Sequence, residues 1–421
     1  MTIMAFAPDF PSGRDIYPGQ ASAMPCGWSV RGKGMDVLVA VAMKRPWMEG
    51  TSEIPGFPSY RSMAVFYGGR NMTLEEIFTI RNLYLAHEKT RRGKLHKNDV
   101  IAFELDKAAQ ISRLRDEIIS GRYRVSPYNT FYIHEPKKRR VDATLYRDRV
   151  VQNCLVENYL GPLLERRLIY DNAACRKEKG TDFARHRLEG FLHECYRKYG
   201  HDFYVLSFDI HHYFESIDHE TLKKKVSRIV MEDEIRDFLF MIIDSFNKEE
   251  GVGLPLGNQT SQCFALYYLD HMDRVIKERF RMKYYTRYMD DGIILSDDLE
   301  KLKRLNGVLH GELSDVRLEM NVKKNHICSI REGLTYLGFT YHLGDTGKLH
   351  SRMAGKKRKR LIRYLNGYEV SYVSLDSYYG YLRKRSTGNG TLKLRLRCRM
   401  KEIRMNEETE RKKKDAHVSC K

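Results

Sequence analysis

Two stretches decide the fold: residues 202–210 read DFYVLSFDI, and residues 282–296 read MKYYTRYMDDGIILS. The first is an apolar run bounded by polar residues, which predicts a buried strand. The second has two β-rich runs around a Met-Asp-Asp turn, which predicts a hairpin. If the strand and the hairpin lie side by side in one sheet, the carboxylates of Asp209, Asp290 and Asp291 come together.

Three carboxylates at close range repel one another unless cations lie between them. Their hard oxygen ligands select Mg²⁺, with Mn²⁺ as a possible substitute. Two such ions, roughly 3.5 to 4 Å apart, activate an attacking hydroxyl and stabilise a leaving pyrophosphate. The three aspartates therefore predict a two-metal site for nucleotidyl transfer. Taken alone, however, an Asp-Asp pair at a hairpin tip is more commonly a solvated turn.

The elements before this core are helical, apart from one hairpin. Apolar periodicity predicts a helix over 72–94, behind a Thr-x-x-Glu capping box at Thr73 and Glu76, and a second over 99–121. Strands are predicted at 130–133 and 139–144, joined by a turn at Pro136. Strand alternation puts Lys137 and Arg139 of this hairpin on one side, where both can face a common anion, although these residues could equally keep an exposed hairpin soluble.

Positive charge is concentrated at the C-terminal end of the chain. The whole chain has a formal net charge of +19, and residues 351–421 contain 21 Lys and Arg against 7 Asp and Glu. This excess favours a polyanionic partner, most simply nucleic acid, over the alternative of a solvated basic tail. We expect a helix over 299–318, short strands within 327–343, a helical region over 355–400 and a frayed end.

Six motifs follow one another in order: the basic hairpin, FDIHHYFESID (208–218), GLPLGNQTSQ (253–262), YMDD (288–291), NVKK (321–324) and YLGF (336–339). The series resembles the ordered motifs of reverse transcriptases, over about residues 73–390. The resemblance implies an α+β right-hand polymerase with fingers, a palm whose antiparallel sheet packs on helices, and a helical thumb. The implied domains are fingers with part of the palm (71–200), palm (201–345) and thumb (346–405). An N-terminal extension (1–70), which matches none of these motifs, and a basic tail (406–421) flank them.

The same resemblance implies roles for individual residues. Asp209, Asp290, Asp291 and Lys324 match the catalytic group, with Lys324 neutralising or protonating the pyrophosphate. The backbone of Ile210 is implied at the metal and triphosphate site. The other matches are nucleotide-binding residues, Lys137, Arg139, Phe214, Leu256 and Gly257, and a primer grip, Leu337, Gly338 and Phe339. Phe214 matches a steric gate that excludes a 2′-hydroxyl. A Phe at such a position is more commonly a core ring, and a lone lysine such as Lys324 is most often solvated at the surface.

The second palm motif indicates a subtype. Many reverse transcriptases have Gln-Gly-x-x-x-Ser-Pro there, whereas residues 256–262 read LGNQTSQ. This variant resembles the enzymes of diversity-generating retroelements, as do EPKKRRVDATLYRDRVVQ, DNAACRKEKGT and SYYGYLRKRST. In that group the aliphatic residue is implicated in misincorporation directed by adenine. Leu256 cannot donate hydrogen bonds as Gln does, so it constrains the template–nucleotide pair less. A phage-defence or retron-like reverse transcriptase and a non-catalytic RNA-binding scaffold are the alternatives.

The partners implied are an RNA template and primer, an RNA–DNA hybrid, dNTPs and a small basic accessory protein. The eight cysteines are scattered and form no Cys-x-x-Cys pair, which favours a reduced setting over a zinc ribbon or a disulfide framework. Nowhere does the chain approach the 18 apolar residues of a membrane span, and its N-terminus has no signal-peptide pattern. We therefore expect a cytoplasmic protein without membrane contact.

Overall fold

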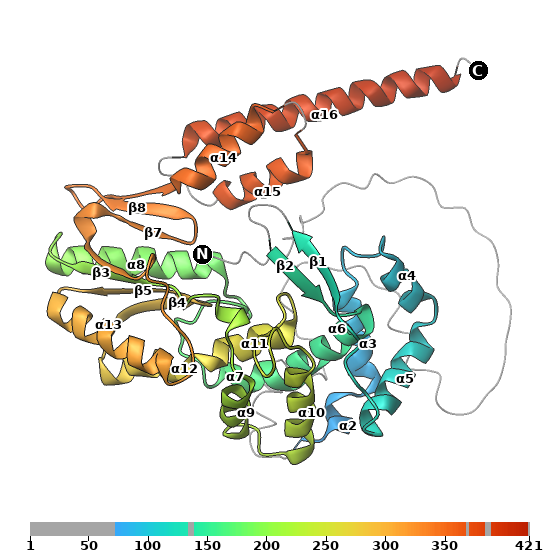
Figure 1. Ribbon diagram of the computed structural model, residues 1–421. Coiled ribbons are helices and arrows are strands. Elements are labelled where there is room, and N and C mark those ends of the chain that lie inside the picture. The colour runs from blue at the N-terminus through green and yellow to red at the C-terminus, as the bar shows by residue number, and fades with distance from the viewer. Residues whose placement is uncertain (1–71, 134–138, 368–369, 384–388, 420–421) are drawn as a thin grey trace, which may run out of the picture. The chain divides into compact units, whose positions relative to one another are not determined.

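The computed structural model describes residues 72–133, 139–367, 370–383 and 389–419 (Figure 1). These residues belong to one compact unit, Asn71–Lys421. The extension predicted for residues 1–70 lies outside the described residues. The described part mixes helices with antiparallel sheets, so the predicted α+β class is confirmed.

The N-terminal helical region has more breaks than the periodicity indicated. The capping box at Thr73 and Glu76 is present, but the helix that it begins stops after one turn. Thr79 then accepts a hydrogen bond from the backbone of Asn82 and caps a new helix, so the single helix predicted over 72–94 is wrong. The helix predicted over 99–121 is likewise interrupted, at Asp106, whose backbone leaves the helical region. The four resulting helices are α2 (Leu74–Ile77), α3 (Ile80–Thr90), α4 (Asn98–Leu105) and α5 (Lys107–Ile119).

The predicted hairpin is present as β1 (Asn129–Ile133) and β2 (Arg139–Ala143), which pair antiparallel as a two-stranded sheet. Residues 134–138, and with them Pro136 and Lys137, lie outside the described residues. Arg139 begins β2, but its side chain also falls outside the description. The structure therefore does not place the side chains of Lys137 and Arg139, which the sequence assigns to the triphosphate.

The central sheet contains both stretches that decide the fold. Its strand order is β4-β5-β3-β6, and every neighbouring pair is antiparallel. The strands are β3 (Tyr204–Phe208), β4 (Tyr284–Tyr288), β5 (Asp291–Ser296) and β6 (His326–Ser329). β3 lies beside β5, as the aspartate cluster requires, and its side chains are buried after the first residue. The predicted buried strand and hairpin are therefore confirmed.

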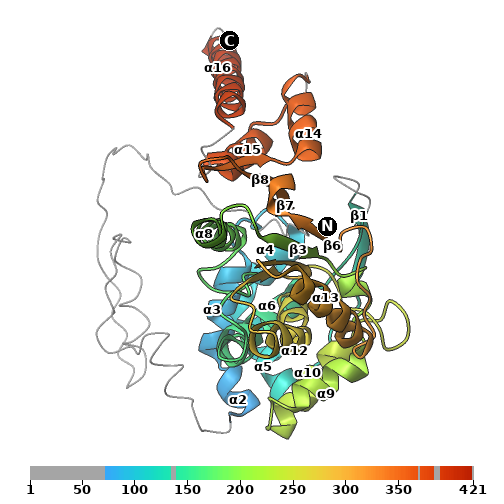
Figure 2. The same cartoon turned by 90° about the vertical axis from the view of Figure 1, so that its left-hand side faces the viewer.

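Helices cover both faces of this sheet. The sheet runs between α8 (Thr181–Tyr199) and α13 (Leu299–Ser314) in both views (Figures 1 and 2). The α13 helix ends four residues before the limit that the sequence predicted, with Asp315 at its C-cap. The remaining helices of this region are α6 (Tyr146–Leu155), α7 (Gly161–Glu165), α9 (His219–Ser227), α10 (Asp233–Asp244), α11 (Gln259–Tyr268) and α12 (Asp270–Arg274), with π-helices at Val156–Leu160 and Val275–Arg279.

The C-terminal region consists of a small sheet followed by helices. The sheet is the antiparallel meander β7 (Leu334–Tyr336), β8 (Phe339–Leu343) and β9 (Leu349–Met353). The helices are α14 (Gly355–Leu365), α15 (Tyr372–Arg383) and α16 (Gly390–Ser419). The frayed end expected for 406–421 is therefore wrong for most of its length, because α16 continues to Ser419. Its sequence after Gly390 is rich in Lys, Arg and Glu and lacks Pro, so helix propensity favours continuation.

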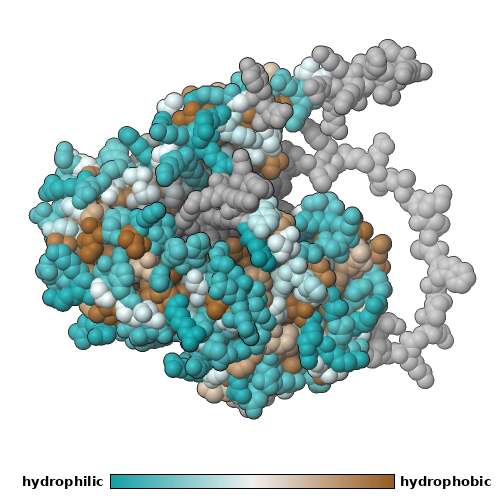
Figure 3. All heavy atoms as spheres, viewed as in Figure 1, coloured by the Kyte–Doolittle hydropathy of each residue, from teal (hydrophilic) through white to brown (hydrophobic). Residues whose placement is uncertain are grey.

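The surface seen in Figure 3 is mainly hydrophilic, with apolar residues scattered among polar ones. No helix among the described residues is both long enough and apolar enough to cross a membrane. The six cysteines that the structure describes are free thiols.

Candidate active site

The register of the central sheet brings Asp209 beside Asp291. Phe208 pairs with Gly292 at the end of β3, so the residue after Phe208 lies next to the residue before Gly292. Opposite Cα atoms in an antiparallel pair are about 4.5 to 5.5 Å apart. Two carboxylates that are 82 positions apart in the sequence therefore come from adjacent strand ends.

Asp290 lies in the turn between β4 and β5, where Met289 adopts the left-handed conformation with φ +55°. The Asp290 side chain is buried, with 6% of the residue exposed. Burial, together with the charges of Asp291 and Asp209, raises the pKa of Asp290 to about 8. The structure thus places all three predicted carboxyl groups close enough to act on one another electrostatically.

Lys324 supplies positive charge at this cluster. Its ammonium group donates a hydrogen bond to Oδ2 of Asp209 and lies 3.8 Å from Oδ1 of Asp291. The lysine is held there by the turn after β-bridge Ile210–Met320, in which its N–H donates to the carbonyl of Asn321. One ammonium group thus lies between carboxylates from two strand ends. A cation at this position lowers the repulsion between the two carboxylates.

Asn321 is a member of the cluster to which sequence reasoning gave no role. Its side-chain amide donates to Oδ1 of Asp209 at 2.8 Å, and its backbone N–H donates to the Asp209 carbonyl, also at 2.8 Å. The first bond orients the Asp209 carboxylate, and the second fixes the Asp209 backbone. The only signal in the sequence is the spacing of Asn321 three residues before Lys324.

The chemistry of these groups fits divalent cations. The donors are carboxylate oxygens, which suit Mg²⁺ or Mn²⁺, and their crowding calls for positive charge beyond that of one lysine. Among the described residues, no group of three or more His, Cys, Asp or Glu side chains has a geometry that could hold a metal ion as it stands. Asp209, Asp290 and Asp291 would hold the ions, and Lys324 would have to leave its present hydrogen bond to Asp209.

Three of the candidate nucleotide-binding residues, Phe214, Leu256 and Gly257, lie in two segments that a backbone hydrogen bond joins. Phe214 lies in a 3₁₀ helix, Tyr213–Glu215, and its carbonyl accepts from the N–H of Leu254 at 2.7 Å. This bond joins the predicted steric gate to the loop that carries Leu256. Gly257 in that loop has φ +98°, a conformation that favours glycine. The Phe214 ring itself is buried and packs edge-on against Tyr213, so the core role remains compatible with the structure.

The candidate primer grip is a strained turn between β7 and β8. Leu337 has φ +45° and Gly338 has φ +79°. The Leu337 carbonyl accepts hydrogen bonds from Arg185 of α8 and from the Tyr381 hydroxyl of α15, each at 2.9 Å. Phe339 stacks on Tyr381 with ring centroids 4.8 Å apart. Arg185 and Tyr381 are thus further residues that sequence reasoning missed, because α8 and α15 lie far from the turn in the sequence.

Residues 134–341 match the family described as reverse transcriptase (RNA-dependent DNA polymerase). This span contains the carboxylate cluster, its lysine and the candidate nucleotide loop. The chain contains a reverse transcriptase domain. The right-hand polymerase class implied by its motifs agrees with the helices and antiparallel sheets of the structure.

Individual relatives are distant. The Escherichia coli K12 protein YkfC is 24% identical, over 55% of this chain and 71% of that protein. Similar solved structures include apo telomerase from Candida tropicalis truncated from its C-terminal domain, at 15% identity and a TM-score of 0.41, over 58% of this chain and 60% of that one. Telomerase from Candida albicans in complex with a fragment of telomeric RNA has 10% identity and a TM-score of 0.42, over 59% and 51%. This reverse transcriptase thus spans about half to three-fifths of those telomerase chains.

Proposed function

We propose that this reverse transcriptase copies an RNA template into DNA, with Asp209, Asp290 and Asp291 as the catalytic carboxylates. The observation that carries the proposal is the contact of one lysine ammonium with carboxylates from two adjacent strands. A buried carboxyl group with a raised pKa lies beside them. Such crowding of like charge costs stability, so its presence at one end of a sheet is evidence of a functional site.

In this proposal each group has a separate task. Bound divalent ions would lower the pKa of the primer hydroxyl and stabilise the charge of the departing pyrophosphate. Asp209 is held in one orientation by Asn321, so its oxygens need no reordering when an ion arrives. Lys324, once free of Asp209, can neutralise the pyrophosphate. Leu337–Phe339 would support the primer end, Lys137 and Arg139 the triphosphate, and the basic C-terminal helices the template–primer duplex.

The direct test is primer extension by the full chain on an RNA template annealed to a DNA primer, with dNTPs and Mg²⁺. We expect incorporation that requires the divalent ion and stops when it is chelated. The same primer on a DNA template of identical sequence measures the preference for RNA. A well-folded preparation that binds RNA but incorporates no dNTP, with the accessory partner also tested, would contradict the proposal and support the RNA-binding scaffold.

Phe214→Val tests the steric gate. If the ring lies under the sugar, the smaller side chain should raise the efficiency of rNTP incorporation relative to dNTP by about tenfold or more, because the clash with the 2′-hydroxyl is removed. The measurement is kcat/KM for matched rNTP and dNTP on one template. Phe280→Val, at a partly buried ring outside the candidate nucleotide loop, is the control. An unchanged ratio in Phe214→Val would leave this ring with a purely structural role.

The subtype forms a finer part of the proposal: an error-prone enzyme of a diversity-generating retroelement, working in the cytoplasm with a small basic accessory protein. The support is LGNQTSQ at 256–262, in which an aliphatic residue stands where many relatives have Gln. A near-duplicate pair of repeats differing at adenines in the neighbouring genomic sequence would support this role. The absence of such repeats would favour a phage-defence or retron-like role.

Leu256→Gln tests the error-prone character. The amide restores hydrogen-bonding groups that constrain the template–nucleotide pair, so misincorporation opposite adenine should fall by roughly threefold or more. Single-nucleotide incorporation opposite each template base measures the effect. Leu256→Met, which keeps an apolar side chain of similar volume, serves as the control. Equal error rates for the Gln and Met variants would show that Leu256 does not set fidelity.

A further inference from the structure

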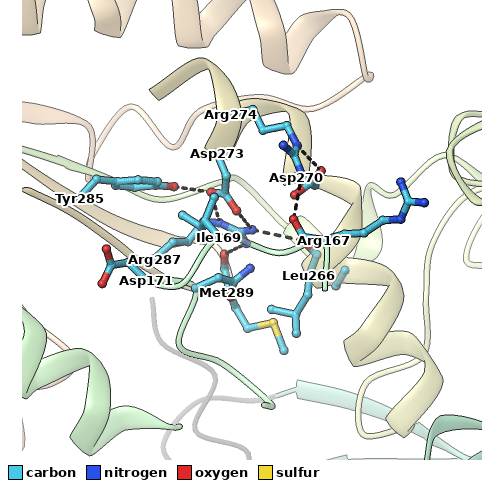
Figure 4. Close-up of polar contacts among 12 residues, drawn as sticks. Arg167, Ile169, Asp171, Leu266, Asp270, Asp273, Arg274, Tyr285, Arg287 and Met289 are labelled. Atoms are coloured by element: carbon cyan, nitrogen blue, oxygen red, sulfur yellow. Dashed lines mark hydrogen bonds and ion pairs between the residues drawn. The ribbon is translucent and has the colours of Figure 1, made fainter. Parts of the chain in front are cut away.

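Beneath the aspartate turn lies a fully buried ion pair, Arg287 of β4 with Asp273 of α12 (Figure 4). Both side chains have no exposed surface. The guanidinium donates to both oxygens of Asp273, from Nε at 2.8 Å and from Nη2 at 2.5 Å. The Tyr285 hydroxyl donates to Oδ1 of the same carboxylate at 2.6 Å. Since this pair does not touch the predicted ligands directly, the proposed chemistry leaves its presence unexplained.

A buried ion pair is a poor way to stabilise a core. Removing two charges from water costs free energy, and apolar residues of similar volume often stabilise a protein as well or better. Stability alone therefore does not explain this ion pair. Geometry does, because the planar guanidinium has five N–H groups in fixed directions. The bonds to Asp273 use only some of these N–H groups.

The other N–H groups hold the aspartate turn. Nη1 of Arg287 donates to the carbonyl of Met289 at 2.6 Å, and Nη2 donates to the carbonyl of Leu266 at 3.2 Å. Met289 is the left-handed residue of the turn, with φ +55°, and its carbonyl belongs to the peptide that joins it to Asp290. This conformation is unfavourable for a residue with a Cβ, so an external bond must stabilise it.

The backbone of Arg287 is itself anchored on two sides, by residues 171–173 and by β5. Its N–H donates to the carbonyl of Asp171 at 3.1 Å, and its carbonyl accepts from Ala173 at 2.9 Å. It also pairs with Gly292 in β5. The guanidinium therefore extends from a fixed strand, is oriented by Asp273 on a fixed helix, and holds the carbonyl that precedes Asp290.

We propose that Arg287 and Asp273 are positioning residues of the polymerase site, which hold the left-handed Met289 turn and so place the Asp290 and Asp291 carboxylates for cations. This inference rests on the proposed function of those carboxylates. It predicts that the geometry of the turn, and not the stability of the core alone, depends on the hydrogen bond from Arg287 to Met289.

Arg287→Lys is the main variant, because lysine keeps the charge beside Asp273 but cannot donate to Asp273, Met289 and Leu266 in the same fixed geometry. We expect kcat for primer extension to fall about 10- to 100-fold, and Mn²⁺ binding, measured on the full chain by electron paramagnetic resonance, to weaken about tenfold. Tyr285→Phe is the matched control. It removes one bond to Asp273 but leaves the bond to Met289, so kcat should stay within about twofold.

A rescue separates positioning from stability. Glycine populates the left-handed region freely, whereas alanine does not. Adding Met289→Gly to Arg287→Lys should recover at least about threefold in kcat and in Mn²⁺ affinity, although glycine lowers thermal stability. Adding Met289→Ala makes nearly the same truncation without conformational relief and should recover nothing.

The outcomes are distinct. Wild-type activity and Mn²⁺ affinity in Arg287→Lys, or equal effects of glycine and alanine at 289, would overturn the positioning role. If Arg287→Lys does not fold, Asp273→Asn takes its place, because it removes the charge that orients the guanidinium. Met289→Gly and Met289→Ala are then added to Asp273→Asn, and equal Mn²⁺ affinities of the two double variants would overturn the proposal. Absence of incorporation by the wild type would instead refute the polymerase function, and the Mn²⁺ titrations would still test the pair.

Discussion

Asp209→Asn is expected to lower kcat for RNA-templated primer extension by about a thousandfold or more. Asparagine keeps the shape of the side chain and one oxygen, but it removes the charge that attracts a divalent ion and the acceptor that Lys324 now contacts. Loss of one carboxylate from a two-metal site removes several kcal/mol of transition-state stabilisation, and about 4 kcal/mol corresponds to a thousandfold. Single-turnover incorporation at saturating dNTP is the measurement.

Asp297→Asn is the matched control for this substitution. Asp297 is an exposed carboxylate just beyond the other end of β5, so it tests the loss of one acidic charge without disturbing the cluster. It should retain wild-type kcat. Folding of both variants is compared by thermal unfolding. Substantial incorporation by well-folded Asp209→Asn would mean that the carboxylate is not a metal ligand.

Gly292→Ala should produce the second largest effect, through the backbone of the same site. A Cβ at Gly292 would lie 2.1 Å from the ring of Phe208, which is buried in β3. Gly292 follows Asp291 and Phe208 precedes Asp209, and the Phe208 ring is buried, so we expect relief of this clash to displace the ring and the two strands that carry the carboxylates. We expect a loss of about 1 to 3 kcal/mol in the free energy of unfolding. We also expect primer extension to fall about a hundredfold, because about 1 Å of misplacement has this cost.

Two further variants make this prediction decisive. Gly307→Ala in α13 places its Cβ where no atom lies within 4 Å, so it should keep full activity and gain slightly in stability. Phe208→Leu combined with Gly292→Ala shortens the ring that clashes and should restore part of the activity. Normal extension by Gly292→Ala alone would show that the strand separation here is not critical.

The sequence alone was sufficient for the elements with strong local signals. The apolar run at 204–208 and the two β-rich runs around Met289 have patterns that few other structures satisfy, and the capping box at Thr73 is a local hydrogen-bond arrangement. The order of the motifs was likewise enough to indicate the reverse transcriptase family. The helix breaks at Phe78 and Asp106 were missed because apolar periodicity continues across them. The first depends on the single capping side chain of Thr79, and at the second the backbone of Asp106 leaves the helical region without a side-chain cap.

What only the tertiary structure decided is which distant groups meet. Phe208 pairs with Gly292, and the amide of Asn321 donates to Asp209. Arg287 reaches Asp273 and Leu266 on other elements while it holds the Met289 carbonyl. No local pattern in the sequence encodes such contacts. The sequence does not distinguish a buried arginine from an exposed one, because burial depends on how distant segments pack. The residue types and their spacing in the sequence determined which catalytic groups the chain has. Three-dimensional packing decided how its carboxylates are held.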